Sequence, residues 1–173
     1  EEARALFPGL ANTTYLATNG QALLDLPNRK GNFRRSRAAA QNIIPTQTWS
    51  PQAVTRILPE LEGRLDGMAL CVPVPDGSCV DLVTLMERNV DPEEVNEVVR
   101  SAAATTMKNI VEYTDQPIVS SDVIGNSHSA IFDGLSSQVL DGNMLKTVTW
   151  YDNGWGYATR VVELIRRLAE IEK

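Results

Sequence analysis

Helix-like and strand-like patterns are segregated along this chain of 173 residues, and that segregation constrains its fold more than any other feature. Apolar residues at helical spacing predict helices at 50–67, 91–107 and 156–172. Strand-like pieces lie between them, at 68–75, 78–88, 109–113, 128–133, 138–140 and 145–151. A few helices among many short strands favour an α+β fold, with helices on one face of an antiparallel or mixed sheet.

The helix at 91–107 has the clearest local signals. Asp91 is suited to cap it, Pro92 fits the first helical position, and Glu93 and Glu94 complement the helix dipole. The expected apolar stripe consists of Val95, Val98, Val99 and Ala102. In the helix predicted at 50–67, Pro59 is expected to end or kink the chain.

Composition and charge exclude several classes of protein. The net charge is −6 and the pI about 4.8, which argues against a nucleic-acid surface. The exception is a basic cluster in the loop-like stretch 21–41, formed by Arg29, Lys30, Arg34, Arg35 and Arg37. No apolar run approaches the roughly 20 residues that a membrane span needs, and no signal-peptide pattern opens the sequence. We therefore expect a cytoplasmic protein that does not bind a membrane.

Cysteine and histidine are too few for a disulfide framework or a metal site. The two cysteines, Cys71 and Cys79, form no CxxC pair, and the single histidine excludes a histidine-rich site. Without a ligand set, no metal is expected.

Several long motifs occur in the chain in a fixed order: AQNIIPT, LPELEGRLDGMALCVPVP, SCVDLV, YTDQPIVSSDVIGNSHSAIFD and VTWYDNGWGYATRVVELI. Together they resemble the catalytic domain of the glyceraldehyde-3-phosphate dehydrogenase family. Upstream, TNGQALLDLP and RRSRAAA resemble the S-loop of that family. The resemblance implies a single domain over 1–173. Its parts would be an N-terminal arm at 1–12, an S-loop-like segment at 13–41 and a sheet-and-helix core at 42–173.

The residues that the family uses for redox chemistry are missing from this sequence. The family carries a nucleotide-binding Rossmann domain and a nucleophilic cysteine in a Ser-Cys-Thr-Thr-Asn-Cys segment, and neither pattern occurs here. Its catalytic histidine follows Thr-Thr-Val, whereas here Thr13 and Thr14 are followed by Tyr15 and Leu16. We therefore expect a truncated relative that uses no cofactor and does not oxidise the triose phosphate.

Phosphate recognition is also altered. The family's arginine after Gly-Met-Ala-Phe corresponds to Cys71, and the glycine after Ser-Thr corresponds to Trp49. The resemblance carries over the remaining candidates for substrate binding, which are Thr18, Arg34, Arg35, Arg37, Thr48, Asn153 and Tyr157. Asn153 matches the family residue that contacts the nicotinamide amide.

Each candidate also has a structural interpretation. Cys71, His128 and Tyr15 are candidate catalytic residues. Cys71 is either a nucleophile or a small buried apolar side chain, and His128 is either an acid–base group or a structural hydrogen-bonding group. The arginines form either an anion clamp or a solvated or subunit-facing loop. Trp49, Tyr15 and Trp155 line an apolar pocket or pack against neighbours, and the carboxylates of Asp25, Asp122 and Asp152 belong to turns or loops.

Two functions remain open. The first is a repurposed domain of specialised biosynthesis that binds a ligand anionic at one end and apolar elsewhere. It would be a binding protein or a non-redox enzyme of cyclisation, isomerisation or addition–elimination. The second is a non-catalytic module for oligomerisation or protein interaction. Both predict a homo-oligomer, dimer or tetramer, because the apolar stripe of 156–172 needs cover.

Overall fold

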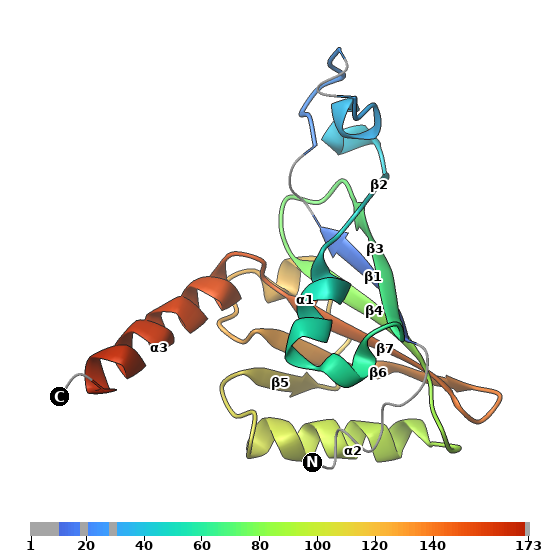
Figure 1. Cartoon of the computed structure of the whole chain (residues 1–173), viewed down its shortest axis with the longest axis vertical. Helices are drawn as coiled ribbons and strands as arrows, with labels where there is room; N and C mark the ends of the chain where they lie inside the picture. The colour runs from blue at the N-terminus through green and yellow to red at the C-terminus, as the bar shows by residue number, and fades with distance from the viewer. Residues whose placement is uncertain (1–10, 18–20, 28–30, 172–173) are drawn as a thin grey trace.

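The computed structural model describes residues 11–17, 21–27 and 31–171, and for 11–17 it describes the backbone only. Within these residues one seven-stranded sheet has the order β2-β3-β1-β4-β7-β6-β5 (Figure 1). The strands are β1 (Ala11–Ala17), β2 (Ile44–Thr46), β3 (Leu65–Cys71), β4 (Ser78–Leu85), β5 (Val111–Thr114), β6 (Ala130–Leu140) and β7 (Met144–Tyr151). Parallel pairing joins β1 to β3 and β5 to β6, and the other neighbours are antiparallel.

Three α-helices accompany this sheet: α1 (Ser50–Ile57), α2 (Pro92–Ala104) and α3 (Trp155–Ile171). The helix α1 contacts β3, whereas α2 packs on β5 and β6 at the other end of the sheet. The helix α3 follows β7 and extends away from the sheet (Figure 1). The expected α+β fold with a mixed sheet is confirmed. No helix among the described residues is long and apolar enough to cross a membrane.

The cap of α2 forms as its sequence predicts. The carboxylate of Asp91 accepts a hydrogen bond of 2.9 Å from the backbone N–H of Glu93, and Pro92 opens the helix. The apolar stripe differs from the expected one, because Val98 is exposed and Asn96 is buried in the interface with the sheet. The amide of Asn96 donates to the carbonyl of Gly134, where a register shift interrupts the pairing of β6 with β7. A polar side chain is tolerated there because its amide forms a hydrogen bond with a backbone carbonyl at that interruption.

Two aromatic rings link α2 to the sheet. Tyr113 on β5 stacks with Phe132 on β6, with ring centroids 6.1 Å apart, and the guanidinium of Arg100 lies 4.5 Å from the Tyr113 centroid. Arg100 also donates to the Tyr113 hydroxyl at 3.0 Å. A side chain at Gly134 would overlap that hydroxyl, since a Cβ there would lie 2.1 Å from it. A small apolar core beneath the other end of α2 comprises Met86, Val90 and Leu145, with Val95 and Val139 packed against it.

The first predicted helix is much shorter than 50–67. It ends at Ile57, Pro59 begins a short 3-10 turn, and β3 already begins at Leu65. Pro59 has no N–H for a helical hydrogen bond, so the chain leaves the helix there. The two pieces expected at 128–133 and 138–140 belong to one strand, β6.

Candidate functional site

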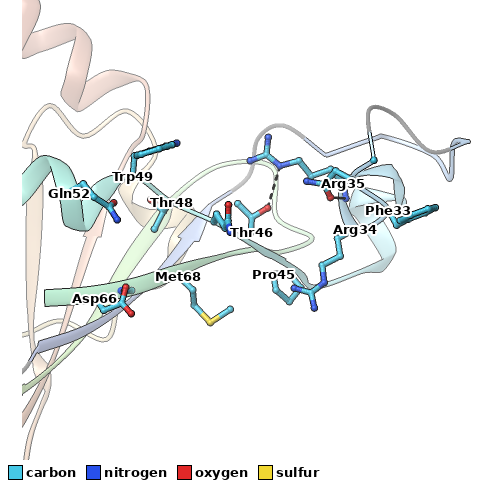
Figure 2. A pocket seen from close by; sticks show the side chains of 14 residues that line it. Phe33, Arg34, Arg35, Pro45, Thr46, Thr48, Trp49, Gln52, Asp66 and Met68 are labelled. Carbon is cyan, nitrogen blue, oxygen red and sulfur yellow. Dashed lines mark hydrogen bonds between the residues drawn. The ribbon is translucent and has the colours of Figure 1, made fainter. Parts of the chain in front are cut away.

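A large cavity lies between the basic loop and the turn that leads into α1. Its volume is about 1060 Å³ (Figure 2). Its walls include the arginines Arg34 and Arg35 and the threonines Thr46 and Thr48. Its apolar walls include Phe33, Pro45, Trp49 and Met68. Trp49 is 83% exposed, so its indole stands beside the cavity and does not plug it. Four of the predicted binding residues, Arg34, Arg35, Thr48 and Trp49, are therefore brought together.

Arg35 is held in place by two neighbours. Its backbone N–H donates to the side-chain oxygen of Asn32 at 3.1 Å, and its Nε donates to Thr46 Oγ1 at 3.4 Å. Within the described part of the chain, no carboxylate forms an ion pair with Arg35. The terminal guanidinium N–H groups are thus available for an anion, which a guanidinium binds with two parallel hydrogen bonds.

Arg37 has a different environment from Arg35, although both belong to the basic loop. Its Nε lies 3.1 Å from Asp25 Oδ1, and the same carboxylate oxygen accepts a 2.8 Å hydrogen bond from the backbone N–H of Ala38. These two contacts, the amide first, lower the pKa of Asp25. Arg37 lines a second, smaller cavity of about 330 Å³. The expected turn role of Asp25 is confirmed, and Arg37 helps to shape the loop.

Thr48 stabilises the turn before α1. Its hydroxyl oxygen accepts from the backbone N–H of Ser50 at 3.1 Å and lies 2.8 Å from the Ser50 hydroxyl. The carbonyl of Trp49 accepts from Ala53 at 2.9 Å, so the backbone of Trp49 is fixed at the start of the helix. Sequence reasoning did not select Thr46, although it lies in the IIPT motif only two residues before Thr48.

Both cysteines are buried. Cys71 ends β3 and is 3% exposed; burial raises the pKa of its thiol, and the positive charge of Arg35 offsets part of that rise. Burial and the nearby charge of Asp81 raise the pKa of Cys79 to about 11. Both environments disfavour the thiolate, which is the nucleophilic form of cysteine. The strand β1 separates these two cysteines, and its Leu16 pairs with both Cys79 and Leu70.

Asn153 and Tyr157 lie at the junction of β7 and α3 and do not line the large cavity. The Asn153 side-chain oxygen accepts from the hydroxyl of Ser78 at 3.0 Å, and Ser78 is almost completely buried. Tyr157 is 74% exposed. The structure therefore separates these two predicted binding residues from the arginines.

The turn from β7 into α3 is held by a carboxylate that accepts hydrogen bonds from its backbone amides. The carboxylate of Asp152 accepts from the N–H groups of Gly154, Trp155 and Gly125 at 2.7–2.8 Å. Burial opposes the ionisation of Asp152, but these three amides together keep its pKa below the usual range. The Asp152 carboxylate thus ties the start of α3 to the loop at Gly125. The expected turn role of Asp152 is confirmed.

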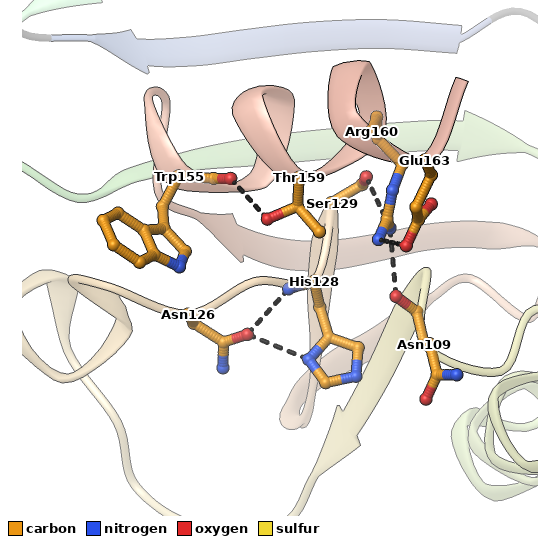
Figure 3. A network of polar contacts seen from close by, with 8 residues as sticks. All are labelled: Asn109, Asn126, His128, Ser129, Trp155, Thr159, Arg160 and Glu163. Carbon is orange, nitrogen blue, oxygen red and sulfur yellow. Dashed lines mark hydrogen bonds and ion pairs between the residues drawn. The ribbon is translucent and has the colours of Figure 1, made fainter. Parts of the chain in front are cut away.

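His128 belongs to a separate polar cluster before β6 (Figure 3). Its Nδ1 lies 2.9 Å from Asn126 Oδ1 and 3.1 Å from Glu112 Oε2, and Asn126 Nδ2 donates to the same carboxylate at 2.8 Å. Both oxygens are acceptors, so Nδ1 carries the hydrogen and Nε2 is the basic nitrogen of the neutral ring. The cluster suits an oriented structural histidine and also an oriented base. No pattern in the sequence marks Glu112 as a partner of His128.

Arg160 connects α3 to the neighbouring sheet end. Its Nη1 donates to the carbonyl of Asn109 at 3.0 Å and to the hydroxyl of Ser129 at 3.3 Å, and its Nη2 lies 2.6 Å from Glu163 (Figure 3). These contacts are confined to the first turns of the helix. The later apolar side chains, Leu164, Ile165, Leu168 and Ile171, are each more than half exposed.

Two remaining predictions lie outside the described structure. Thr18 is not among the described residues, and only the backbone of Tyr15 is.

Asp122 accepts a 2.7 Å hydrogen bond from the backbone of Val119, as expected for a turn carboxylate. Among the residues whose side chains are described, no group of three His, Cys, Asp or Glu is arranged to hold a metal ion.

The comparison with known proteins decides the family. The model of the glyceraldehyde 3-phosphate dehydrogenase C-terminal domain matches residues 2–153. The chain belongs to this family. The sequence is 49% identical over 171 residues to glyceraldehyde-3-phosphate dehydrogenase of Borreliella burgdorferi, covering 98% of this chain and 50% of that protein.

Other members of the glyceraldehyde-3-phosphate dehydrogenase family are similarly close. The enzyme of Geobacillus stearothermophilus is 47% identical over 161 residues, which are 93% of this chain and 48% of that protein. Glyceraldehyde-3-phosphate dehydrogenase 2 of Bacillus subtilis is 44% identical over 169 residues, which are 98% of this chain and 49% of that protein. The chain spans about half the length of the curated relatives it matches.

Proposed function

We propose that this glyceraldehyde-3-phosphate dehydrogenase-like domain no longer performs NAD-dependent oxidation and instead binds an organic anion in the cavity beside the basic loop. It would act as a small non-redox enzyme or as a binding protein. The observation that carries the proposal is the cavity itself, which combines Arg34 and Arg35 with Trp49, Pro45 and Met68.

The loss of oxidation is argued from positions within this chain. The family chemistry needs a base to activate a thiolate adduct of the aldehyde, and Leu16, at the corresponding position, cannot accept a proton. Cys71 replaces a cationic side chain that would bind phosphate, and its buried thiol carries no charge to attract one. Loss of one member of a cooperating catalytic set costs several orders of magnitude in rate.

Binding of an organic anion is argued from what the cavity offers. A guanidinium is suited to a carboxylate or phosphate, and the neighbouring apolar walls favour a ligand whose remainder is apolar. Small acids of specialised biosynthesis have this character. A non-redox step such as cyclisation or isomerisation needs a ligand held in a reactive geometry and one or two polar groups. His128 does not line the cavity, so an acid–base role for it would belong to a different site.

Calorimetric titration of the protein with inorganic phosphate and with small organic carboxylates tests this function. We expect at least one of these anions to bind, and Arg35→Ala to weaken it roughly tenfold, since a charge-assisted hydrogen bond contributes on the order of 1.5–3 kcal/mol. Arg56→Ala is the control, because Arg56 is exposed on α1 and does not line the cavity. Binding that Arg35→Ala leaves unchanged would place the anion site elsewhere.

A second candidate is a non-catalytic module that assembles with itself. The specific observation in its favour is the exposed apolar stripe at the end of α3, which includes Leu164 and Leu168. Contiguous apolar surface of this kind is uncommon on soluble monomers. Homo-oligomerisation is compatible with anion binding, so we propose it for both candidates.

A further inference from the structure

We propose that the cavity takes an anion joined to a planar aromatic ring, with the ring stacked on the indole of Trp49 and the anion held by Arg35. This proposal rests on the proposed anion-binding function and adds the chemical class of the ligand's other end.

The exposure of Trp49 is the first observation. Tryptophan is among the most buried residue types on average, yet Trp49 is 83% exposed beside a cavity of about 1060 Å³. An indole in this position presents a wide π face to any ligand in the cavity. Aromatic rings pair with such a face in offset or edge-on arrangements, which aliphatic groups cannot do.

The backbone that carries the indole is held by its turn. Thr48 accepts from the backbone of Ser50, and the carbonyl of Trp49 accepts from Ala53 in the first turn of α1. The backbone beneath the indole is thus ordered before a ligand arrives. A fixed platform binds a ring with less loss of conformational entropy than a mobile loop does.

The direction of the charged groups selects Arg35 over Arg34 as the partner of Trp49. In Figure 2 the Arg35 guanidinium and the Trp49 indole extend to the same side of the chain that runs through β2, whereas Arg34 and Met68 extend to the other side. Asp66 lies on that other side as well, where its negative charge disfavours an anion near it. A ligand with an anion at one end and a ring at the other therefore fits along the Arg35–Trp49 side.

The cavity is larger than an inorganic anion alone would need. Inorganic phosphate alone would occupy a small part of about 1060 Å³ and would leave the indole uncovered. An aryl phosphate or aryl carboxylate, by contrast, contacts both the guanidinium and the indole. These two anion types share the chemistry that the cavity recognises.

The test compares matched probes by calorimetry: 1-naphthyl phosphate, 1-naphthylacetate, n-octyl phosphate and inorganic phosphate. We expect at least one naphthyl anion to bind about tenfold more tightly than the octyl anion. Trp49→Leu, which keeps apolar bulk but removes the π face, should remove that preference. Trp49→Phe should restore most of it. Trp155→Leu is the control, because Trp155 is an exposed tryptophan on α3 outside the cavity.

The outcomes separate the two proposals. Naphthyl binding that Arg35→Ala weakens and Trp49→Leu leaves unchanged would overturn the stacking proposal and leave the anion site intact. Failure of all four probes to bind, or equal binding by wild type and Arg35→Ala, would overturn both. A change in molecular mass of Trp49→Leu in light scattering, without a change in naphthyl affinity, would assign the indole to a contact between copies and would also overturn stacking.

Discussion

Arg35 and Arg37 are two positions apart in one basic loop, yet their surroundings give them different tasks. Arg37 is paired with Asp25, whereas the side chains that hydrogen-bond to Arg35 among the described residues are the uncharged ones of Asn32 and Thr46. The sequence places both arginines in a basic cluster and cannot distinguish them. Only the fold shows which guanidinium faces the large cavity, because that depends on the 3-10 turn at Arg34–Ser36.

Thiol chemistry provides a test at the residue scale. Burial raises the pKa of Cys71, and burial together with the charge of Asp81 raises that of Cys79 to about 11, so both thiols stay protonated at neutral pH. We expect both thiols to react with iodoacetamide far more slowly in the folded protein than in guanidinium chloride. Peptide mass spectrometry after timed alkylation measures this. Rapid alkylation of folded Cys71 at neutral pH would instead support a nucleophilic role.

At the scale of elements, helix ends and strands differ in how well the sequence predicts them. The start of α2 is predictable because Asp91 and Pro92 act locally. The strand β1 is not, because it pairs with β3 and β4 only through long-range contacts and most of its residues fall in the segment that resembles the family's S-loop. The same limit applies to Asn96, whose burial depends on an interruption of β6 that lies 38 residues away in sequence.

The start of α3 depends on one ionised side chain, and this gives a pH-dependent prediction. Since the folded state lowers the pKa of Asp152, its stabilising contribution is present above about pH 4 and is lost as the pH falls through the folded value. We expect Asp152→Asn to lower the free energy of unfolding by about 1–3 kcal/mol at neutral pH, because three part-buried hydrogen bonds lose their charged acceptor. Denaturant melts at several pH values would show this difference shrinking below about pH 4. A difference that stays constant down to about pH 3 would contradict the assigned role.

For the molecule as a whole, the sequence predicts the family and the fold class, whereas the candidate site is only partly predictable. The motifs located Arg34, Arg35, Thr48 and Trp49, which share one cavity. They also suggested Asn153 and Tyr157, which the fold places at another junction. Motif resemblance transfers positions, but whether those positions still form one site depends on the three-dimensional arrangement of this chain.

Assembly is a prediction at the scale of the whole molecule. Leu164, Ile165, Leu168 and Ile171 are 53–74% exposed on α3, and covering each fully contributes roughly 1.5–3 kcal/mol. We expect light scattering at micromolar concentration to give a multiple of 19.0 kDa, and Leu168→Glu to shift the mass toward the monomer. Ile57→Glu on α1 is the matched control, because Ile57 is exposed outside this stripe. A wild-type monomer of 19.0 kDa would refute assembly through this helix.

Loss of the dehydrogenase reaction is tested most directly by following NADH formation from glyceraldehyde-3-phosphate, NAD and inorganic phosphate. The enzyme of Geobacillus stearothermophilus, 47% identical to this chain, serves as the positive control under the same conditions. If Leu16 stands at the position of the catalytic base and Cys71 at that of the phosphate-binding arginine, as the family resemblance implies, we expect no NADH above background. Steady NADH production by this protein, proportional to its concentration, would contradict the proposed loss of redox function.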